Sequence, residues 1–222
     1  MASLTEMLGV PDAERYASVR AVVAAAETVM TFPAMPAISV RLVSAVNGGG
    51  EGAYVRQRGG PPLRIEIAEQ AEYPELTVAH ELAHYLDDSG FGTPEGWASE
   101  AEPRLEALRQ AWENTVSVCA LRRGLETGQL TARLSNGVLI EFPLMPEEQE
   151  NCRYYLQGRE LFARSYAQYL AHKSKNRVLL HQVRLRRESV EGRFYQVQWA
   201  EGDFRAVAQA LDQIWGGYGW LR

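Results

Sequence analysis

Residues 78–88 read VAHELAHYLDD and contain the pattern HExxH, formed by His80, Glu81 and His84. Two histidines four residues apart lie about 40° apart around a helix, so both imidazoles can reach one metal ion. Glu81 lies beside them, where it can take a proton from a metal-bound water. The apolar residues share one face of the helix expected over about 76–89; these are Val78, Ala79, Leu82, Ala83 and Leu86. The stretch therefore predicts a metal site on a half-buried helix.

This pattern is typical of zinc metallopeptidases. A pattern with three fixed positions also arises by chance, mostly on surface helices, but here it follows a predicted strand and has a coherent apolar face. The chain contains four histidines, and the motif uses two of them. A catalytic zinc site holds the ion with three protein ligands and keeps one position open. We therefore expect one Zn²⁺ per chain and a third ligand elsewhere in the sequence.

Several residues are weaker candidates for that third ligand. One subclass of these enzymes uses a histidine six residues after His84, but Gly90 stands there. His172 and His181 have no motif around them and are expected to be solvated or to cap helices. Together with Asp88, they remain the alternatives.

The favoured third ligand is Glu160, near the start of a helix predicted over about 158–172. Small residues on this helix, namely Ala163, Ala167 and Ala171, would let it pack closely on the histidine helix. A glutamate at a helix start more often only stabilises the helix dipole, so that alternative stays open.

The stretch HELAHYLDD (80–88), followed by YYLQGRELFARSYAQY (154–169), resembles the HExxH…E-x-x-A arrangement of gluzincins. It is most similar to lethal-factor-type toxin peptidases and to phage- or mobile-element-borne peptidase domains with an E-[LM]-F-A-R helix. The resemblance implies a minimal zincin-like fold, zinc held by His80, His84 and Glu160, and Glu81 as the general base.

The resemblance also implies a tyrosine two helical turns before the zinc glutamate, where it stabilises the transition-state oxyanion. Arg153 stands seven residues before Glu160, so the candidates are Tyr154 and Tyr155. We favour Tyr155 as the catalytic tyrosine, with packing in the core as its alternative role.

Two further residues are expected around the metal ligands. Asp87 falls between His80 and His84 in angle, one turn along the helix, where it could orient a ligand histidine or pair with Arg164. Such outer partners tune metal sites. The alternative for Asp87 is a carboxylate near the helix end with no role in the site.

The remaining pattern predicts an α+β chain with a small, mainly antiparallel sheet. We interpret residues 1–222 as one domain, with a core of about 11–89 and 150–172, an insert of about 90–149 and a C-terminal cover of 173–222. The expected elements are a helix over 11–31, strands over 37–46, 53–57 and 63–67, a long helix ended by Gly124, a hairpin of 130–134 with 138–142, a strand over 195–199, and a helix capped by Asp203.

Composition narrows the partners. A formal charge of −5 over 222 residues gives no electrostatic reason to expect nucleic acid. The basic run over 173–187 has few aromatic residues and is expected to be a solvated face. No secretory signal and no apolar run of membrane-spanning length is present, so we expect a cytoplasmic protein with no membrane partner, in which Cys119 and Cys152 are reduced core residues.

These observations predict a zinc-dependent endopeptidase acting on a peptide or protein substrate. The strand over 53–57 would be the sheet edge along which the peptide lies. The alternative is a zinc-bound regulatory or protein-binding module with little turnover, and the insert of about 90–149 could hold a regulatory partner.

Overall fold

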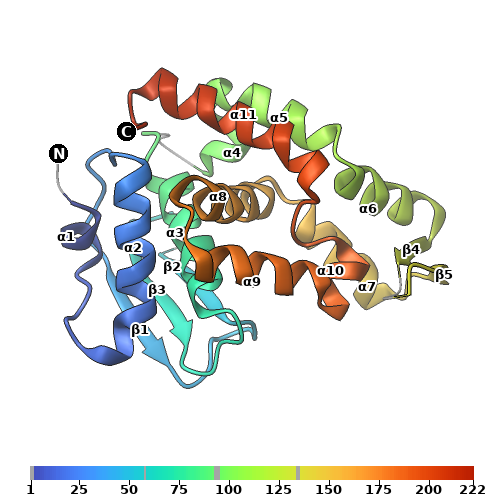
Figure 1. Cartoon of the computed structure of the whole chain (residues 1–222), viewed down its shortest axis with the longest axis horizontal. Helices are drawn as coiled ribbons and strands as arrows, with labels where there is room; N and C mark the ends of the chain where they lie inside the picture. Colours follow the sequence, from blue (N-terminus) through green and yellow to red (C-terminus); the bar gives the residue numbers. More distant parts are fainter. Residues whose placement is uncertain (1–2, 58, 93–95, 134–135) are drawn as a thin grey trace.

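The computed structural model describes residues 3–57, 59–92, 96–133 and 136–222 (Figure 1). Its elements, in chain order, are α1 (Leu4–Leu8), η1 (Glu14–Tyr16), α2 (Ala17–Val29), β1 (Ser39–Val43), β2 (Gly52–Arg56), β3 (Pro62–Ala68), α3 (Pro74–Ser89), α4 (Ala98–Ala101), η2 (Pro103–Leu105), α5 (Glu106–Glu113), α6 (Val116–Thr127), β4 (Gln129–Arg133), β5 (Leu139–Pro143), α7 (Pro146–Tyr155), α8 (Gly158–Ser174), α9 (Arg177–Glu188), α10 (Val190–Tyr195) and α11 (Glu201–Tyr218). The expected α+β class is confirmed; η1 and η2 are short 3-10 helices.

The main sheet has three strands in the order β1-β3-β2. It is mixed and not mainly antiparallel as predicted, because β1 runs parallel to β3, with Val40 opposite Ile65. β2 and β3 form an antiparallel pair in which Tyr54 lies opposite Ile65. Alternating hydrophobicity identifies a strand but does not determine the direction of its neighbour, so the parallel pairing of β1 with β3 was not predictable from the alternation. β2 is an edge strand, as expected.

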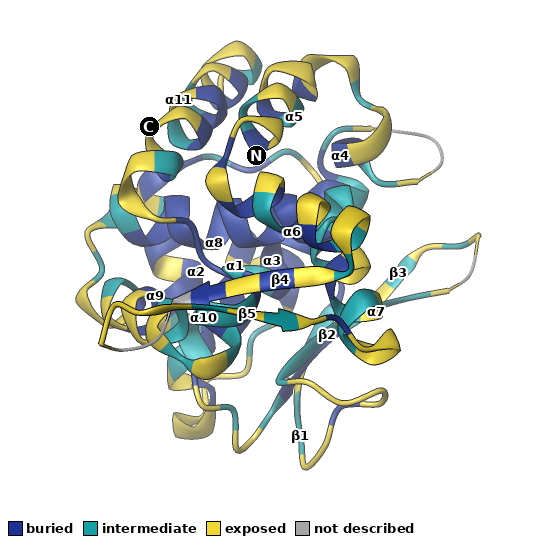
Figure 2. Cartoon of the chain, turned by 90° about the vertical axis from the view of Figure 1, so that its right-hand side faces the viewer, coloured by how far each residue is buried: buried dark blue, intermediate teal, exposed yellow. Residues whose placement is uncertain are grey.

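The helix pair α3 and α8 forms the centre of the molecule. α3 contacts α8 more extensively than any other helix, and Ala163, Ala167 and Ala171 of α8 are fully buried. Small side chains let two helix backbones approach closely, which is why this contact is extensive. In Figure 2, α8 is almost entirely dark blue, with α11 and α5 lying above it.

The insert differs from its prediction. The long helix is divided into η2, α5 and α6, because Thr115 caps the start of α6 by accepting a hydrogen bond from the Val118 amide. α6 continues past Gly124 and ends at Gly128, whose φ of +69° gives a left-handed cap. The hairpin of β4 and β5 is present, while residues 134 and 135 of its predicted turn lie outside the described residues.

The C-terminal cover also differs from its prediction. Residues 195–199 are not a strand, because α10 continues to Tyr195 and Gln196 then turns with a φ of +49°. α11 begins at Glu201, and its Asp203 is not the cap but accepts a hydrogen bond from the Val116 amide. At the other end, the first predicted helix is shorter and runs from Ala17 to Val29 after η1.

Two further expectations can be compared with the structure. None of the helices in the described ranges is long and apolar enough to cross a membrane. Cys119 and Cys152 are both free, but only Cys152 is buried; Cys119 is exposed, so it is not a core residue.

Candidate metal centre

His80 and His84 lie on one face of α3 and point their Nε2 atoms at the same place. These two nitrogens are 3.1 Å apart, and the rings meet edge to face with centroids 4.7 Å apart. The opposite face of α3 fixes this orientation, since Leu82, Ala83 and Leu86 are fully buried. The predicted helix therefore presents both imidazoles in one direction.

Glu160 of α8 completes the group. Its Oε2 lies 3.3 Å from Nε2 of His80 and its Oε1 lies 3.4 Å from Nε2 of His84. The three ligand atoms all lie within 4.8 Å of one another, and Glu160 is buried. Two imidazole nitrogens and one carboxylate oxygen that converge in this way could bind a metal ion.

The alternative third ligands lie elsewhere. His172 lies in the last turn of α8, with its Nε2 3.9 Å from a carboxylate oxygen of Glu201. His181 is exposed beside Arg184. The carboxylate of Asp88 accepts hydrogen bonds from the side chains of Tyr54 and Arg56. None of the three joins the His80–His84 pair.

Glu160 and His80 each shift the pKa of the other. Burial raises the pKa of Glu160, but hydrogen bonds and charge from both histidines outweigh burial and hold it well below its usual range. Burial lowers the pKa of His80, but the hydrogen bond and charge of Glu160 reverse the direction and raise it. The glutamate is thus an anion in this site, which is the form that binds a metal.

Glu81 lies next to this group, between α3 and the edge strand β2. A Cβ atom on Gly52 would stand 2.8 Å from Oε1 of Glu81, so only glycine lets the strand approach the carboxylate this closely. Burial raises the pKa of Glu81, against the opposing charges of the two histidines. A buried carboxylate with a raised pKa beside a metal site is suited to proton transfer.

Tyr155, the favoured catalytic tyrosine, stays a prediction, and the structure places both tyrosines at the cavities around the metal ligands. The Tyr155 hydroxyl donates to the Glu191 carboxylate, and its ring packs against Tyr195, in the lining of the larger of two cavities that meet at the metal ligands. Tyr154 lines the cavities on both sides of Glu160, and its pKa is raised first by burial and then by the charge and hydrogen bonding of Glu160. Cys152 and Tyr155 lie on one face of α7 at i and i+3, and both pack in the small apolar cluster.

The two expected outer partners do not pair with each other. Asp87 is fully buried, and its carboxylate accepts hydrogen bonds of 2.6 Å from both the amide and the hydroxyl of Ser99. It therefore attaches the start of α4 to α3 and does not orient a histidine. Asp87 can reach Ser99 because α4 packs on both α3 and α8.

Arg164 is buried and bridges the end of α7 to the start of α8. Its guanidinium donates to the backbone carbonyls of Glu160 and Tyr155. It also lies over the rings of Tyr155 and Trp199. Arg164 thus links the end of α7, which carries Tyr154, to the start of α8, which carries Glu160. Burial lowers the pKa of its guanidinium to about 10.

Two cavities meet at the metal ligands. The larger, about 610 Å³, extends from His80 and Glu81 past Tyr154 toward Arg164 and Gln198. The smaller, about 270 Å³, has a wall made by Trp97, whose ring meets that of His84 at 5.5 Å. Both cavities include Gly52, Glu81, Tyr154 and Glu160 in their linings, so they form one cleft that runs through the site and along β2.

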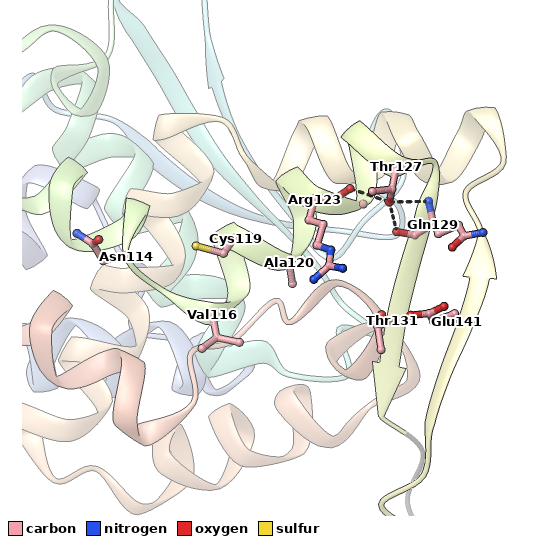
Figure 3. A pocket seen from close by; sticks show the side chains of 10 residues that line it. Asn114, Val116, Cys119, Ala120, Arg123, Thr127, Gln129, Thr131 and Glu141 are labelled. Carbon is pink, nitrogen blue, oxygen red and sulfur yellow. Dashed lines mark hydrogen bonds between the residues drawn. The ribbon is translucent and has the colours of Figure 1, made fainter.

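A third cavity, about 430 Å³, lies in the insert between α6 and β4 (Figure 3). Cys119, Arg123 and Thr131 are among the side chains that line it, and it shares no lining residue with the cleft. In the described part of the chain, its lining includes no group of metal-ligating residues. The expected regulatory partner at the insert stays a prediction.

Comparison with known proteins found no matching family model, curated protein or solved structure. The distances between His80, His84 and Glu160 are therefore the support for a metal site, with Glu81 beside it. Sequence reasoning found these four residues but missed Gly52, Trp97 and Gln198, which lie in loops or at element ends where no periodic pattern identifies them.

Proposed function

We propose that this protein is a zinc-dependent endopeptidase. The observation that carries the proposal is the set of ligand separations. Zinc bonds of about 2.0–2.1 Å at tetrahedral angles place neighbouring ligand atoms roughly 3.3 Å apart. The two Nε2 atoms are 3.1 Å apart, and each lies 3.3 or 3.4 Å from a different oxygen of the Glu160 carboxylate, so the residues present fit this ion.

His80, His84 and Glu160 would hold the zinc ion, which when bound supplies Lewis acidity that activates a water and polarises a carbonyl. Glu81 takes the proton of the attacking water and later delivers it to the nitrogen of the leaving amine, as the C–N bond breaks. Its raised pKa favours the uptake of this proton. The Tyr154 hydroxyl donates a hydrogen bond to the carbonyl oxygen as negative charge develops there.

The edge strand β2 provides the binding surface for the substrate backbone. β2 pairs only with β3 among the described strands, so its other edge is available for an added strand. The cleft runs along this strand past Glu81 and continues in both directions from the metal ligands. A cleft open on both sides of the reacting carbonyl fits an endopeptidase.

The test compares zinc content and cleavage. Elemental analysis should give one zinc per wild-type chain and little zinc in Glu160→Ala, whereas Glu141→Ala, an exposed carboxylate of the insert, should keep it. The wild-type protein should also cleave a peptide library, with activity lost to a chelator and restored by zinc.

Two results would contradict the proposal in different ways. Full zinc retention in Glu160→Ala would place the third ligand elsewhere. One zinc per wild-type chain without cleavage of any protein in a lysate would instead support a zinc-bound regulatory or protein-binding module.

A further inference from the structure

Arg159 brings a positive charge to the smaller cavity of the cleft. It lines this cavity together with Glu81, His84, Trp97 and Glu160. Arg159 is only partly buried, so a ligand in the cavity can reach it. Within the described ranges, no carboxylate forms an ion pair with Arg159, although two carboxylates belong to the same lining. The cavity therefore contains a cation whose charge no described side chain neutralises.

Two contacts hold the guanidinium of Arg159 at the wall of the cavity. Its Cζ lies over the ring of Trp97, 5.6 Å from the ring centroid, in a cation–π contact. Its Nε donates a hydrogen bond of 2.9 Å to the side-chain oxygen of Gln157. In the described part of the chain, Nη1 and Nη2 make no hydrogen bond. These two nitrogens can bind both oxygens of one carboxylate, so the guanidinium is oriented and its binding end is unused.

The fold fixes Trp97 in its turn. Trp97 directly precedes α4, in which the amide and the hydroxyl of Ser99 donate hydrogen bonds of 2.6 Å to the buried Asp87. At the start of α8, a Cβ atom on Gly158 would stand 3.2 Å from Cγ of Glu100, so α4 lies close against this helix end. The indole ring and the guanidinium are thus placed together before any substrate binds, which lowers the entropy cost of binding.

The other polar groups of the smaller cavity already have partners. The two carboxylate oxygens of Glu160 lie 3.3 and 3.4 Å from Nε2 of His80 and of His84. The hydroxyl of Tyr54 donates a hydrogen bond of 2.6 Å to Asp88. The ring of His84 meets that of Trp97 with centroids 5.5 Å apart, so a single indole ring lies between the guanidinium and an expected metal ligand. A group bound by Arg159 would therefore lie close to the reacting bond.

We propose that Arg159 determines specificity by binding an acidic side chain of the substrate, that of a glutamate or aspartate close to the cleaved bond. The inference rests on the proposed peptidase function. The carboxylate would accept hydrogen bonds from Nη1 and Nη2 of Arg159. A lysine or arginine of the substrate would meet a like charge, and a carboxamide would supply an acceptor without the charge. Because the cleft continues on both sides of the metal ligands, the carboxylate comes from a side chain and not from the end of the substrate.

Cleavage kinetics test the preference. Peptides with both ends blocked carry glutamate, glutamine, lysine or leucine at one position at a time on either side of the scissile bond. At the best position, the wild-type kcat/KM should be about 10–100-fold higher for the glutamate peptide than for the glutamine peptide, which has the same shape without the charge. Arg159→Gln should abolish this difference, and Arg159→Glu should favour the lysine peptide.

The matched control is Arg123→Gln. Arg123 is an exposed arginine that lines the separate cavity of the insert, and it forms no ion pair with a carboxylate in the described ranges. This variant loses the same charge from the chain as Arg159→Gln, so the two differ only in where the charge is lost. Arg123→Gln should keep the full preference for the glutamate peptide.

Binding of uncleaved peptides separates this inference from the peptidase proposal. Calorimetric titration of Glu81→Gln, or of the wild-type protein if it cleaves nothing, should give about 10–100-fold tighter binding of the glutamate peptide than of the glutamine peptide. Adding Arg159→Gln should remove this difference. Such a difference in a protein that cleaves nothing would retain the subsite and contradict the peptidase.

Three results would overturn the subsite and retain the peptidase. They are cleavage without an acidic preference, a stronger preference for the glutamine, lysine or leucine peptide, and an acidic preference that survives Arg159→Gln. The last is the result expected if the carboxylate of the substrate binds a metal ion and not Arg159. Neither cleavage nor binding of any peptide would overturn both proposals.

Discussion

The region around the metal ligands and the α6–β4–β5 region of the insert both contain a cavity with charged side chains, but they are built differently. The first belongs to a large apolar cluster that includes Val22, Leu82, Phe162 and Trp215. The second rests on a small separate cluster made by six buried residues, including Leu121 and Leu130. Figure 2 shows the contrast, with α8 dark blue and much of β4 and α6 yellow.

The difference shows what a buried site requires. Glu81 and Glu160 are buried, and loss of solvent makes their interactions with the histidines strong and shifts their pKa values. Glu141 of β5 is exposed to solvent, which screens its charge. Carboxylates therefore line a cavity in both regions, and burial in the large core alters the pKa values of Glu81 and Glu160.

The largest expected effect is on peptide cleavage, and it distinguishes Glu81 at the metal ligands from Glu141 in the insert. Glu81→Gln should keep zinc and reduce kcat/KM for peptide cleavage by about 10²–10⁴-fold, because the general base is removed. Glu141→Gln, the matched change in the insert, should leave cleavage unchanged. If Glu81→Gln cleaves the peptide library as fast as wild type, Glu81 is not the base.

The next largest effect is the loss of stability when a buried side chain is truncated in either apolar cluster. Phe162→Ala should lower the free energy of unfolding by about 3–5 kcal/mol, since a fully buried ring is lost from a core that cannot collapse around the cavity. Leu130→Ala should cost about 2 kcal/mol, because the small cluster can relax toward its exposed side. Urea unfolding of both variants measures the difference, and equal costs would show that the two regions share one core.

A smaller effect is expected at Asp87, which joins α3 to the start of α4. Burial raises its pKa to about 7, despite the hydrogen bonds from Ser99. The folded protein therefore binds more protons than the unfolded chain between about pH 4 and pH 7, so this carboxyl makes the free energy of unfolding fall as pH rises through that range. The fall should be on the order of 2–4 kcal/mol relative to Asp87→Asn. Parallel stability curves for the two proteins would contradict this explanation.

The smallest expected effect is the loss of stability when an ion pair is broken, and each region offers one such pair. Arg122 and Glu113 form an exposed pair in the insert, so Glu113→Gln should cost less than about 1 kcal/mol. The side chain of Asp88 is only 5% exposed and bonds both Arg56 and Tyr54 beside the cleft. Asp88→Asn should cost about 1–3 kcal/mol because buried donors lose a charged partner. Thermal unfolding should rank the two variants in this order, and a reversed order would contradict the comparison.

Much of the site could be predicted from the sequence. His80 and His84 come together because backbone hydrogen bonds fix the helical repeat, which places residues four apart on one face in any context. Glu160 was identified by the small residues around it and by resemblance, and the structure places it with the histidines. Edge strand β2 and the hairpin were found from alternation and turn residues.

Contacts between elements were not predictable in the same way. Tyr154 lines both cavities of the cleft and Tyr155 only the larger one because of how α7 packs, and Asp87 bonds Ser99 because α4 lies over it. The parallel pairing of β1 and the position of Gln198 likewise depend on residues far away in the sequence. The sequence by itself determined the repeats and spacings within each element, since these follow from local backbone geometry. Only the tertiary structure decided which side chains meet across elements, because those contacts depend on how all the elements pack together.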